Sequence, residues 1–392
     1  MNSEERREAR YQRRKAKREE RKKMRNEGHN LQIVSEFGAL RRSFYQARKG
    51  TNWKASVQNY GCNVLRNSYN YSRKMRNHQK IGKGFIEFDL CERGKKRHIS
   101  SVHITERVVQ KSVCDYGIVP VIEKSLIYEN GASIKGKGTG FSEKLLVKHL
   151  QKHYRKSGFK NSGYIVLGDE HNFFGSLDHG VVLRNMRKMI TDNELIDQTM
   201  EFINAFDSGL GLGSQVCQIN AVAYSNAIDH YIKEVLRYEY NKYMDDWYVI
   251  VDTKEEADKI LEIITKMYAD LGVSMNENKT RKEKISHGFT WLQTRYYLTD
   301  TGKVIRKPSH KKISRDRRKL KKIAALDRSR EEKYKASVSV FAAFNGYMKG
   351  KNAYWAKKDM EKLFNDLFIK DFYIGGQNYE QISVTEQRQC NH

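Results

Sequence analysis

The chain has 392 residues, of which 39% are hydrophobic, so it is long enough for two or three hydrophobic cores and is not disordered as a whole. Its 74 Lys and Arg residues outnumber its 47 Asp and Glu residues, and the net charge of +27 predicts a polyanionic partner, either nucleic acid or an acidic membrane surface. The sequence has no apolar run of the ~18–20 residues that span a membrane, no signal peptide and no C-x-x-C pair among its five cysteines, so we expect a cytoplasmic protein without a zinc ribbon or a disulfide framework.

The first 28 residues, "MNSEERREARYQRRKAKREERKKMRNEG", contain almost no apolar side chains. Glu and Arg or Lys recur at spacings of three and four residues, which favours a solvated helix. Two interpretations stay open: a frayed, partly helical tail, or an arm that lies along the phosphates of a nucleic acid. We treat residues 1–30 as a basic N-terminal arm.

Residues 31–85 show a helical pattern in which basic and aromatic residues alternate. Such a pattern suits base stacking with phosphate contact, and it suits an aromatic stripe facing a core equally well. The next segment, "GFIEFDLCERGKKRHISSVHI", alternates as a β-hairpin whose turn is "ERGKKR". A helical segment, the glycine-rich loop "NGASIKGKGTGFSE" and a basic helix follow it.

The second half begins with an apolar strand in "GYIVLGDEHNFFGSLDH" that ends at Asp169. Helices are predicted over 180–207, then after the glycines of "DSGLGLGSQVCQ", before the hairpin "EYNKYMDDWYVIVD". The segment "TKEEADKILEIITKMYADLG" is an amphipathic helix, and "GFTWLQTRYYLTDTGKVI" is rich in strand formers. From about residue 308 the pattern is basic and helical.

Three carboxylates fall at strand ends or turns: Asp169, Asp245 and Asp246. The order strand, helices, hairpin allows both elements to be neighbours in one antiparallel sheet, with the acids at one edge. A bare Asp-Asp pair is usually a solvated turn, but the flanking "KYM" and "WYVIV" disfavour this. Clustered carboxylates suit two Mg²⁺ ions, with Mn²⁺ as a substitute, and two metals about 4 Å apart stabilise the attacking and leaving oxygens of a phosphoryl transfer.

At these residues the sequence resembles the reverse transcriptases. "YMDD" in an apolar hairpin is similar to their motif C, which implies that Tyr243 and Met244 lie near the primer end and the incoming nucleotide. "LGDEHNFFGSLDH" resembles motif A, where the first acid binds metal and an aromatic residue five positions later screens the sugar 2′ position; these roles fall on Asp169 and Phe174. "LGLGSQVCQ" resembles motif B, the glycine loop beside the base pair, and implies nucleotide-binding positions at Leu212, Gly213 and Gln218.

Further motifs follow in the family's order. "LGVSMNENKT" resembles motif D, whose lysine is a proposed proton donor to the pyrophosphate; this is Lys279, although a plain surface lysine fits the sequence too. "KKRHI" with "ERVVQ" resembles the fingers motif that holds the triphosphate, through Lys95 and Arg97 with Arg107 and Gln110 in support, and "ASIKGKGT" occupies the place of the next fingers motif. "GFTWLQTRYY" resembles motif E, the primer grip, formed by Gly288, Phe289, Trp291 and Leu292.

The resemblance covers residues 90–300 approximately and implies an α/β (α+β) right-hand polymerase fold. It has fingers at 31–160, a palm with an RRM-like antiparallel sheet at 161–305, and a helical thumb with a C-terminal tail at 306–392. The implied activity is RNA-directed DNA synthesis from dNTPs on a primer, with an RNA template and a DNA product. An aromatic wall at Phe174 favours dNTPs over NTPs, which argues against the alternative of an RNA-dependent RNA polymerase. A second alternative, a non-catalytic RNA-binding protein, would have lost the acids that this chain retains.

Two positions depart from the family pattern. Many members have Gln where this chain has Leu212, and Ser-Pro where it has Cys217-Gln218. An aliphatic residue and a closing Gln at these two positions resemble the motif B of enzymes from diversity-generating retroelements and from defence-associated or unclassified bacterial groups. We therefore expect either antiviral defence with a dedicated non-coding RNA, or a mutagenic retroelement enzyme with an accessory protein. We expect no membrane partner, and the sequence indicates no oligomeric state.

Overall fold

The computed structural model describes residues 2–92 and 94–370. By its contacts the chain divides into two compact units, the first formed by residues 1–149 with 163–282 and the second by residues 150–162 with 283–392. Each unit is built around a hydrophobic core of its own. The fold mixes helices and sheets and is 58% helical, which confirms the expected fold class.

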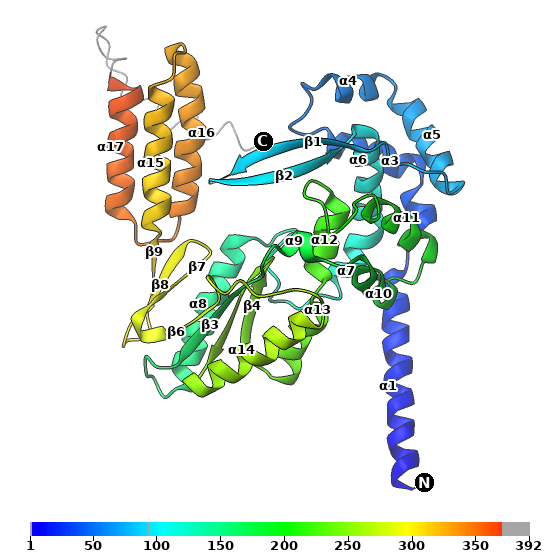
Figure 1. Ribbon diagram of the computed structural model, residues 1–392, viewed down its shortest axis with the longest axis horizontal. Coiled ribbons are helices and arrows are strands. Elements are labelled where there is room, and N and C mark those ends of the chain that lie inside the picture. The colour runs from blue at the N-terminus through cyan, green and yellow to red at the C-terminus, as the bar shows by residue number, and fades with distance from the viewer. Residues whose placement is uncertain (1, 93, 371–392) are drawn as a thin grey trace. The chain divides into compact units, whose positions relative to one another are not determined.

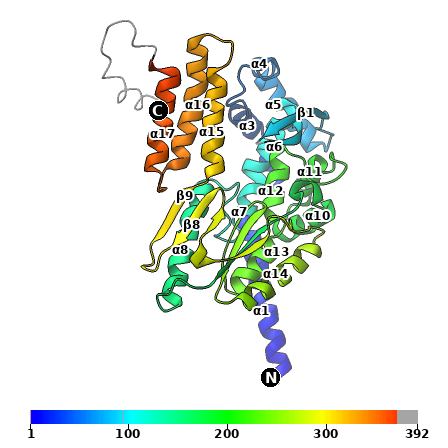
Figure 2. The same ribbon diagram turned by 60° about the vertical axis from the view of Figure 1, so that its left-hand side comes forward.

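The first unit opens with helices and a long hairpin (Figure 1). Its first helix, α1 (Ser3–Asn26), extends away from the other elements of this unit in both views (Figure 1, Figure 2). It is followed by four shorter helices, α2 (Leu31–Val34), α3 (Phe37–Ala47), α4 (Ala55–Cys62) and α5 (Val64–Arg76). Aromatic residues of this segment, such as Phe44 and Tyr60, are buried and stacked on each other, so part of the predicted aromatic pattern serves the core.

The hairpin consists of β1 (Phe85–Glu92) and β2 (Lys95–Val102), which pair in antiparallel register. The sequence predicted the hairpin but gave it a longer turn, "ERGKKR". The strands in fact extend to Glu92 and resume at Lys95, so the basic run from Lys95 lies on a strand. The alternating pattern of a strand continues through the basic residues. These residues can lie on β2 because most of the first half of this strand is exposed to solvent.

Most of the remaining first unit is helical. The helices that follow the hairpin up to residue 282 are α6 (Ile104–Ser112), α7 (Val119–Glu123), α8 (Thr139–Lys156), α9 (Phe173–Ser176), α10 (His179–Met189), α11 (Asn193–Ile203), α12 (Gln215–Ala223), α13 (Asn226–His230) and α14 (Lys254–Ala269). Two π-helical turns, Val113–Ile118 and Tyr231–Val235, continue α6 and α13.

A four-stranded sheet positions the candidate acids. Its strand order is β4-β5-β3-β6, with β3 (Tyr164–Asp169), β4 (Glu239–Tyr243), β5 (Asp246–Val251) and β6 (Arg281–Lys284). The central strands β3 and β5 are almost continuously apolar and buried, as expected for strands covered on both faces. They run antiparallel, with Asp169 opposite Asp246.

Helix α14 covers one part of this sheet, packing against β3 and β5. It begins where Thr253 accepts a hydrogen bond from the backbone N–H of Glu256 at 3.1 Å, a typical N-cap. Its buried residues Ala257, Ile260, Ile264 and Tyr268 recur every three to four positions, which places them on one face. The amphipathic pattern that predicted this helix therefore also identifies the face that packs on the sheet.

In its described part, the second unit contains the end of α8, a three-stranded sheet and three further helices that run side by side (Figure 1, Figure 2). Its strands are β7 (Phe289–Trp291), β8 (Thr294–Leu298) and β9 (Val304–Pro308), and its helices are α15 (His310–Ala324), α16 (Arg330–Met348) and α17 (Tyr354–Phe368). The helices share a core formed around Leu320, Phe344 and Met360. The predicted C-terminal tail falls mainly on 371–392, outside the described residues. Among the described helices, none has the length and apolar character to cross a membrane.

Candidate active site

The first acid, Asp169, ends strand β3 with its side chain almost completely buried. Its backbone carbonyl accepts a hydrogen bond from the N–H of Asn276 at 2.8 Å. The N–H of the next residue, Glu170, donates to the carbonyl of Asp245 at 3.1 Å. The end of β3 is therefore held on both sides by backbone contacts, and one of these leads directly to the second acid.

The other two acids lie at the tight turn between β4 and β5. Tyr243 pairs with Asp246, so only Met244 and Asp245 form the loop. Met244 has a φ of 56°, a conformation that is uncommon for a residue with a side chain and that is found preferentially at functional sites. The turn brings Asp245 and Asp246 to the same end of the sheet as Asp169, as the sequence predicted.

The three carboxylates repel one another. Burial, and then the charges of Asp245 and Asp169, raise the pKa of Asp246 to about 7. Burial, and then the charge of Asp169, also raise the pKa of Asp245 from its ordinary value. The backbone thus holds together charges that would separate in solution, and a cation at this position would stabilise them.

Lys279 supplies one such positive charge. Its ammonium group lies 2.7 Å from Oδ1 and 2.6 Å from Oδ2 of Asp169. Burial opposes the charge, but the hydrogen bond to Asp169 and the neighbouring carboxylates raise the pKa of Lys279 overall. Asn276 donates a further hydrogen bond to Asp169 Oδ1 at 2.9 Å. Asn276 was not among the predicted site residues, although it lies in the same motif, three positions before the lysine.

A buried ion pair lies directly behind the acids. Lys242 of β4 is 1% exposed, and its ammonium group is 3.1 Å from Oε1 of the fully buried Glu170. The same ammonium donates to the hydroxyl of Tyr268 at 2.9 Å and to that of Ser225. The pair joins the residue that follows Asp169 to the strand that leads into Asp245. Sequence reasoning missed this pair, although Lys242 lies on the same face of the strand as Tyr240, which is also buried.

A cavity of about 800 Å³ opens beside the acids. Its lining combines Asp169 and Asp245 with basic residues of β2, aromatic residues of α9 and the glycine loop that precedes α12. The predicted site residues among the lining are Arg97, Asp169, Phe174, Leu212, Met244, Asp245 and Lys279. The fold therefore gathers parts of five separate sequence motifs around one space, within a single unit of the chain.

Phe174 and the glycine loop form one wall of this cavity. The carbonyl of Phe174 accepts a hydrogen bond from the N–H of Leu210 at 2.7 Å, and its ring meets Phe173 edge to face. The carbonyl of Leu212 accepts from the N–H of Ser100 in β2 at 3.3 Å. Gly213 has a φ of 113°, and a Cβ there would come within 3.0 Å of the Ser100 carbonyl. A glycine is thus needed for the loop to approach the hairpin so closely.

Other predicted residues lie differently. Gln218 donates to the hydroxyl of Ser133 at 2.9 Å and, like Tyr243, is absent from the described lining. Gln110 is buried and accepts a hydrogen bond from Ser214, the N-cap of α12, while Arg107 contacts Ser101, so both support neighbouring elements. Lys95 begins β2, but its side chain lies outside the described part of the structure. Lys96 and His98 line the cavity and were missed, although both lie within the quoted "KKRHI".

The predicted primer-grip residues belong to the second unit. Gly288 precedes β7 with a φ of 69°, and a Cβ there would lie 2.5 Å from the ring of Tyr297. Phe289 and Trp291 are buried within that unit, and Phe289 stacks on Tyr296. Leu292 has a φ of 44° in the turn to β8. These residues form a tight, strained hairpin within the second unit.

The acid cluster fits a cation chemically. In the described part of the chain no group of three or more His, Cys, Asp or Glu residues has the geometry of a preformed metal site. The donor set is nevertheless all oxygen, which Mg²⁺ prefers, and the ammonium group of Lys279 already takes a cation's place on Asp169. Asp169, Asp245 and Asp246 are the residues that would hold divalent metal.

The chain matches a known protein family. A family model described as "Reverse transcriptase (RNA-dependent DNA polymerase)" matches residues 81–296. This range is more than half of the chain and includes the hairpin β1–β2, the three acids and Lys279. No curated protein sequence matches the chain.

Solved structures of two yeast telomerases are similar at a low level. Apo telomerase from Candida tropicalis truncated from its C-terminal domain has 13% identity and a TM-score of 0.44, over 56% of this chain and 54% of that one. Telomerase from Candida albicans in complex with a fragment of telomeric RNA has 9% identity and a TM-score of 0.47, over 76% and 60% respectively. The chain thus spans between about half and two thirds of the length of these proteins.

Proposed function

The chain belongs to the reverse transcriptase (RNA-dependent DNA polymerase) family, and from that membership we propose that it adds dNTPs to a primer along an RNA template. The observation that carries the proposal is the meeting of Asp169, Asp245 and Asp246 at one end of the sheet, beside a cavity large enough for a nucleotide. Within this proposal, residues 31–160 are the fingers, 161–305 the palm and 306–392 the thumb and tail.

Two divalent cations, Mg²⁺ in the first place, would be held by the three aspartates and would stabilise the attacking and leaving oxygens of phosphoryl transfer. Lys279 donates a proton toward the pyrophosphate in this scheme. It is suited to the role because its raised pKa keeps it protonated at neutral pH and because it already lies at Asp169. A general acid placed in this way contributes about 10²–10⁴-fold to a rate.

Within the proposal, the residues of the cavity wall favour dNTPs over NTPs as substrates. Phe174 lies on α9, five positions after Asp169, and lines the same cavity as that acid. An aromatic ring at the sugar excludes a 2′-hydroxyl by steric contact, which favours dNTPs. Arg97 lines the same cavity from β2 and provides positive charge for the triphosphate.

The biological role in our proposal is the synthesis of DNA from a dedicated non-coding RNA in antiviral defence, in the cytoplasm. The net charge of +27 supports a nucleic-acid partner. Leu212, an apolar residue that lines the cavity in place of the usual glutamine, supports an enzyme with altered nucleotide choice. The alternative role consistent with Leu212 is mutagenic copying in a diversity-generating retroelement, with an accessory protein.

Primer extension tests the chemistry. The purified chain is given a DNA primer annealed to an RNA template, with dNTPs and Mg²⁺, and the extension products are compared with those of Asp245→Asn/Asp246→Asn. We expect extension that needs the cation and disappears in the double variant. RNA binding by both proteins with no extension by either would instead indicate a non-catalytic RNA-binding protein. Sequencing of DNA that co-purifies with the chain would then separate defence from diversification by the identity of its template.

A further inference from the structure

Helix α1 has its charges separated between two faces. At 100° per residue, nine basic residues fall within one sector of about 140° that contains no acidic residue. We call this the basic sector of α1; it consists of Arg6, Arg7, Arg10, Arg13, Arg14, Lys17, Arg18, Arg21 and Arg25. The acidic residues all lie outside it, at Glu4, Glu5, Glu8, Glu19 and Glu20. The sequence predicted a solvated helix from its alternating charges. In the structure these charges are not evenly distributed around the helix.

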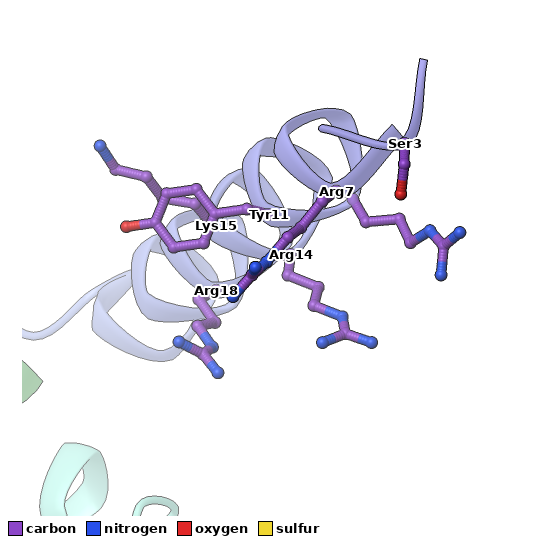
Figure 3. A pocket seen from close by; sticks show the side chains of 7 residues that line it. Ser3, Arg7, Tyr11, Arg14, Lys15 and Arg18 are labelled. Atoms are coloured by element: carbon purple, nitrogen blue, oxygen red, sulfur yellow. The ribbon is translucent and has the colours of Figure 1, made fainter. Parts of the chain in front are cut away.

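The basic side chains are not neutralised within the protein. Among the described residues, none of the nine forms an ion pair, and eight of them are exposed. Arg25 is partly buried, and its Nε has no hydrogen-bond partner in the described structure. Figure 3 shows the guanidinium groups of Arg7, Arg14 and Arg18 along one side of the helix, with a hollow between them and Tyr11. Like charges at spacings of three and four residues destabilise a helix unless an anion lies on them.

The last turn of α1 is fixed to the body of the first unit through residues outside the basic sector. The Asn26 amide donates to the carbonyl of Met189 at 2.9 Å and accepts from the N–H of Thr191 at 3.1 Å. Lys22 donates to the carbonyl of Arg187 at 2.7 Å. Around the helix, Lys22 lies about 40–180° and Asn26 about 80–180° from the members of the basic sector, so neither of the residues that hold α1 to α10 belongs to the sector. The helix is thus anchored at one end and leaves its cationic face open.

We propose that the basic sector of α1 binds the phosphate backbone of a base-paired RNA segment, outside the cavity that holds the acids. Eight of the nine residues are arginines, whose planar guanidinium groups bind phosphate oxygens in pairs. The row from Arg7 to Arg25 is about 27 Å long at 1.5 Å per residue. No side chain within the sector is aromatic. Tyr11 lies at its edge and lines the hollow with Arg7, Arg14 and Arg18, but a single ring provides no series of platforms on which successive unpaired bases would stack. The sector also has no row of large apolar residues such as inserts into a membrane surface.

This inference rests on the proposed use of an RNA template, because RNA is the polyanion which that function supplies. Binding at α1 would hold a stem of the template RNA while an unpaired stretch enters the cavity. The excess positive charge of the N-terminal segment would then serve to capture the RNA, and the aspartates would serve the chemistry. The two functions can accordingly be measured in separate experiments.

The test compares two double variants of the full chain. Arg10→Gln/Arg14→Gln removes two charges from the basic sector, and Lys254→Gln/Lys259→Gln removes two exposed charges from α14, where acidic residues surround them. Binding of a fluorescent 20-base-pair RNA hairpin is followed by anisotropy, without dNTPs, at several salt concentrations. We expect the α1 variant to bind about tenfold more weakly at physiological salt, with a salt slope lower by about 2 because two phosphate contacts are lost. The α14 variant should bind like the wild type.

Equal affinity and slope for the α1 variant and the wild type would overturn the proposal. An equal loss in both variants would also overturn it, since net charge alone would explain the binding. A loss that is larger for an unpaired 20-nucleotide RNA, for a DNA hairpin or for anionic vesicles than for the RNA hairpin would reassign the surface to that partner. Circular dichroism verifies that α1 remains helical. Primer extension on a short template is measured separately, so that failure of the polymerase proposal in the wild type is distinguished from failure at α1.

Discussion

Lys279 places its ammonium group within 2.7 Å of both carboxylate oxygens of Asp169, where a divalent cation would also have to bind. A bound metal would therefore compete with the lysine for one carboxylate. In the absence of metal the lysine reduces the repulsion among the three acids, and its displacement would free an ammonium group beside the reacting phosphates. The same residue would thus stabilise the empty site and act as a proton donor in the filled one.

Replacing Lys279 with glutamine should separate these two effects. We expect the rate of nucleotide addition to fall by about 10² or more, because the proposed proton donor is lost. The Mg²⁺ concentration for half-maximal rate should fall as well, because no ammonium group competes for Asp169. Single-turnover primer extension over a Mg²⁺ titration measures both. Lys282→Gln is the control, since that lysine pairs with Asp258 on the surface; an unchanged Mg²⁺ requirement in Lys279→Gln would contradict the competition.

Asp246→Asn should stabilise the metal-free protein at alkaline pH. The pKa of Asp246 is raised from 3.8 to about 7, so its contribution to folding is fully present below pH 4 and is lost as the pH rises through 7. Each pKa unit corresponds to about 1.4 kcal/mol, so we expect a gain of up to a few kcal/mol at pH 8 that disappears near pH 4. Thermal melting in EDTA at several pH values measures it. A variant less stable than the wild type at pH 8 would contradict the repulsion among the acids.

Phe174→Val should weaken the discrimination against NTPs. Removing the ring opens space at the sugar, and differences of this steric kind are worth about 10- to 200-fold in specificity. We expect the ratio of kcat/KM for a dNTP over the matching NTP to fall by this amount. Phe206→Leu is the matched control, because Phe206 also lines the cavity but stacks on Phe85 of the hairpin. A similar loss in both variants would mean that cavity volume, and not the position of Phe174, sets the preference.

Leu212→Gln tests whether this residue alters base selection. The backbone of Leu212 is held by Ser100, so a longer polar side chain can enter the cavity without moving the loop. We expect the misincorporation spectrum on an RNA template to change by about tenfold at one or more bases, the scale of one hydrogen bond. Sequencing of many extension products measures it. Gln218→Ser, which breaks the contact with Ser133, is the control at the second unusual position; an unchanged spectrum in Leu212→Gln would refute the hypothesis.

The sequence predicted most of the elements that carry the acids. An apolar strand that ends in Asp169, and a hairpin with two central aspartates, are local patterns, and the order of elements allowed the antiparallel pairing that the structure shows. The contact between Gln218 and Ser133, by contrast, joins α12 to a loop 85 positions earlier. No spacing or periodicity reports such a contact. The turn of the first hairpin was drawn too long because basic residues on an exposed strand resemble turn residues.

The buried pair of Lys242 and Glu170 shows the same limit. A lysine in a strand is normally exposed. Lys242 can be buried because Glu170, Tyr268 and Ser225 bind its ammonium group, and these three residues come from separate parts of the chain. Glu170 directly follows Asp169, and its carboxylate stabilises the positive charge of Lys242. The ion pair therefore packs directly beneath the acids. The sequence contains both residues within recognised motifs, but it does not indicate that they meet.

Breaking this pair should unfold the first unit more easily. Lys242→Met leaves Glu170 buried without its partner, and loss of one member of a buried ion pair costs about 3–5 kcal/mol. Lys242→Met/Glu170→Gln should recover a large part of this loss, because no uncompensated charge remains. Urea unfolding of both variants measures the free energies. The control is Lys282→Met. Lys282 and its partner Asp258 have side chains that are 35% and 48% exposed, so this variant should lose no more than about 1 kcal/mol of unfolding free energy.

The same two variants test whether the pair also positions the acids. Lys242 lies on the strand that enters the turn at Met244, and the backbone of Glu170 is bonded to Asp245, so repacking the pair should shift the carboxylates relative to one another. We expect the stable double variant to need more Mg²⁺ for half-maximal extension, even where its free energy of unfolding is close to that of the wild type. A normal Mg²⁺ requirement in that variant would restrict Lys242 and Glu170 to a role in stability.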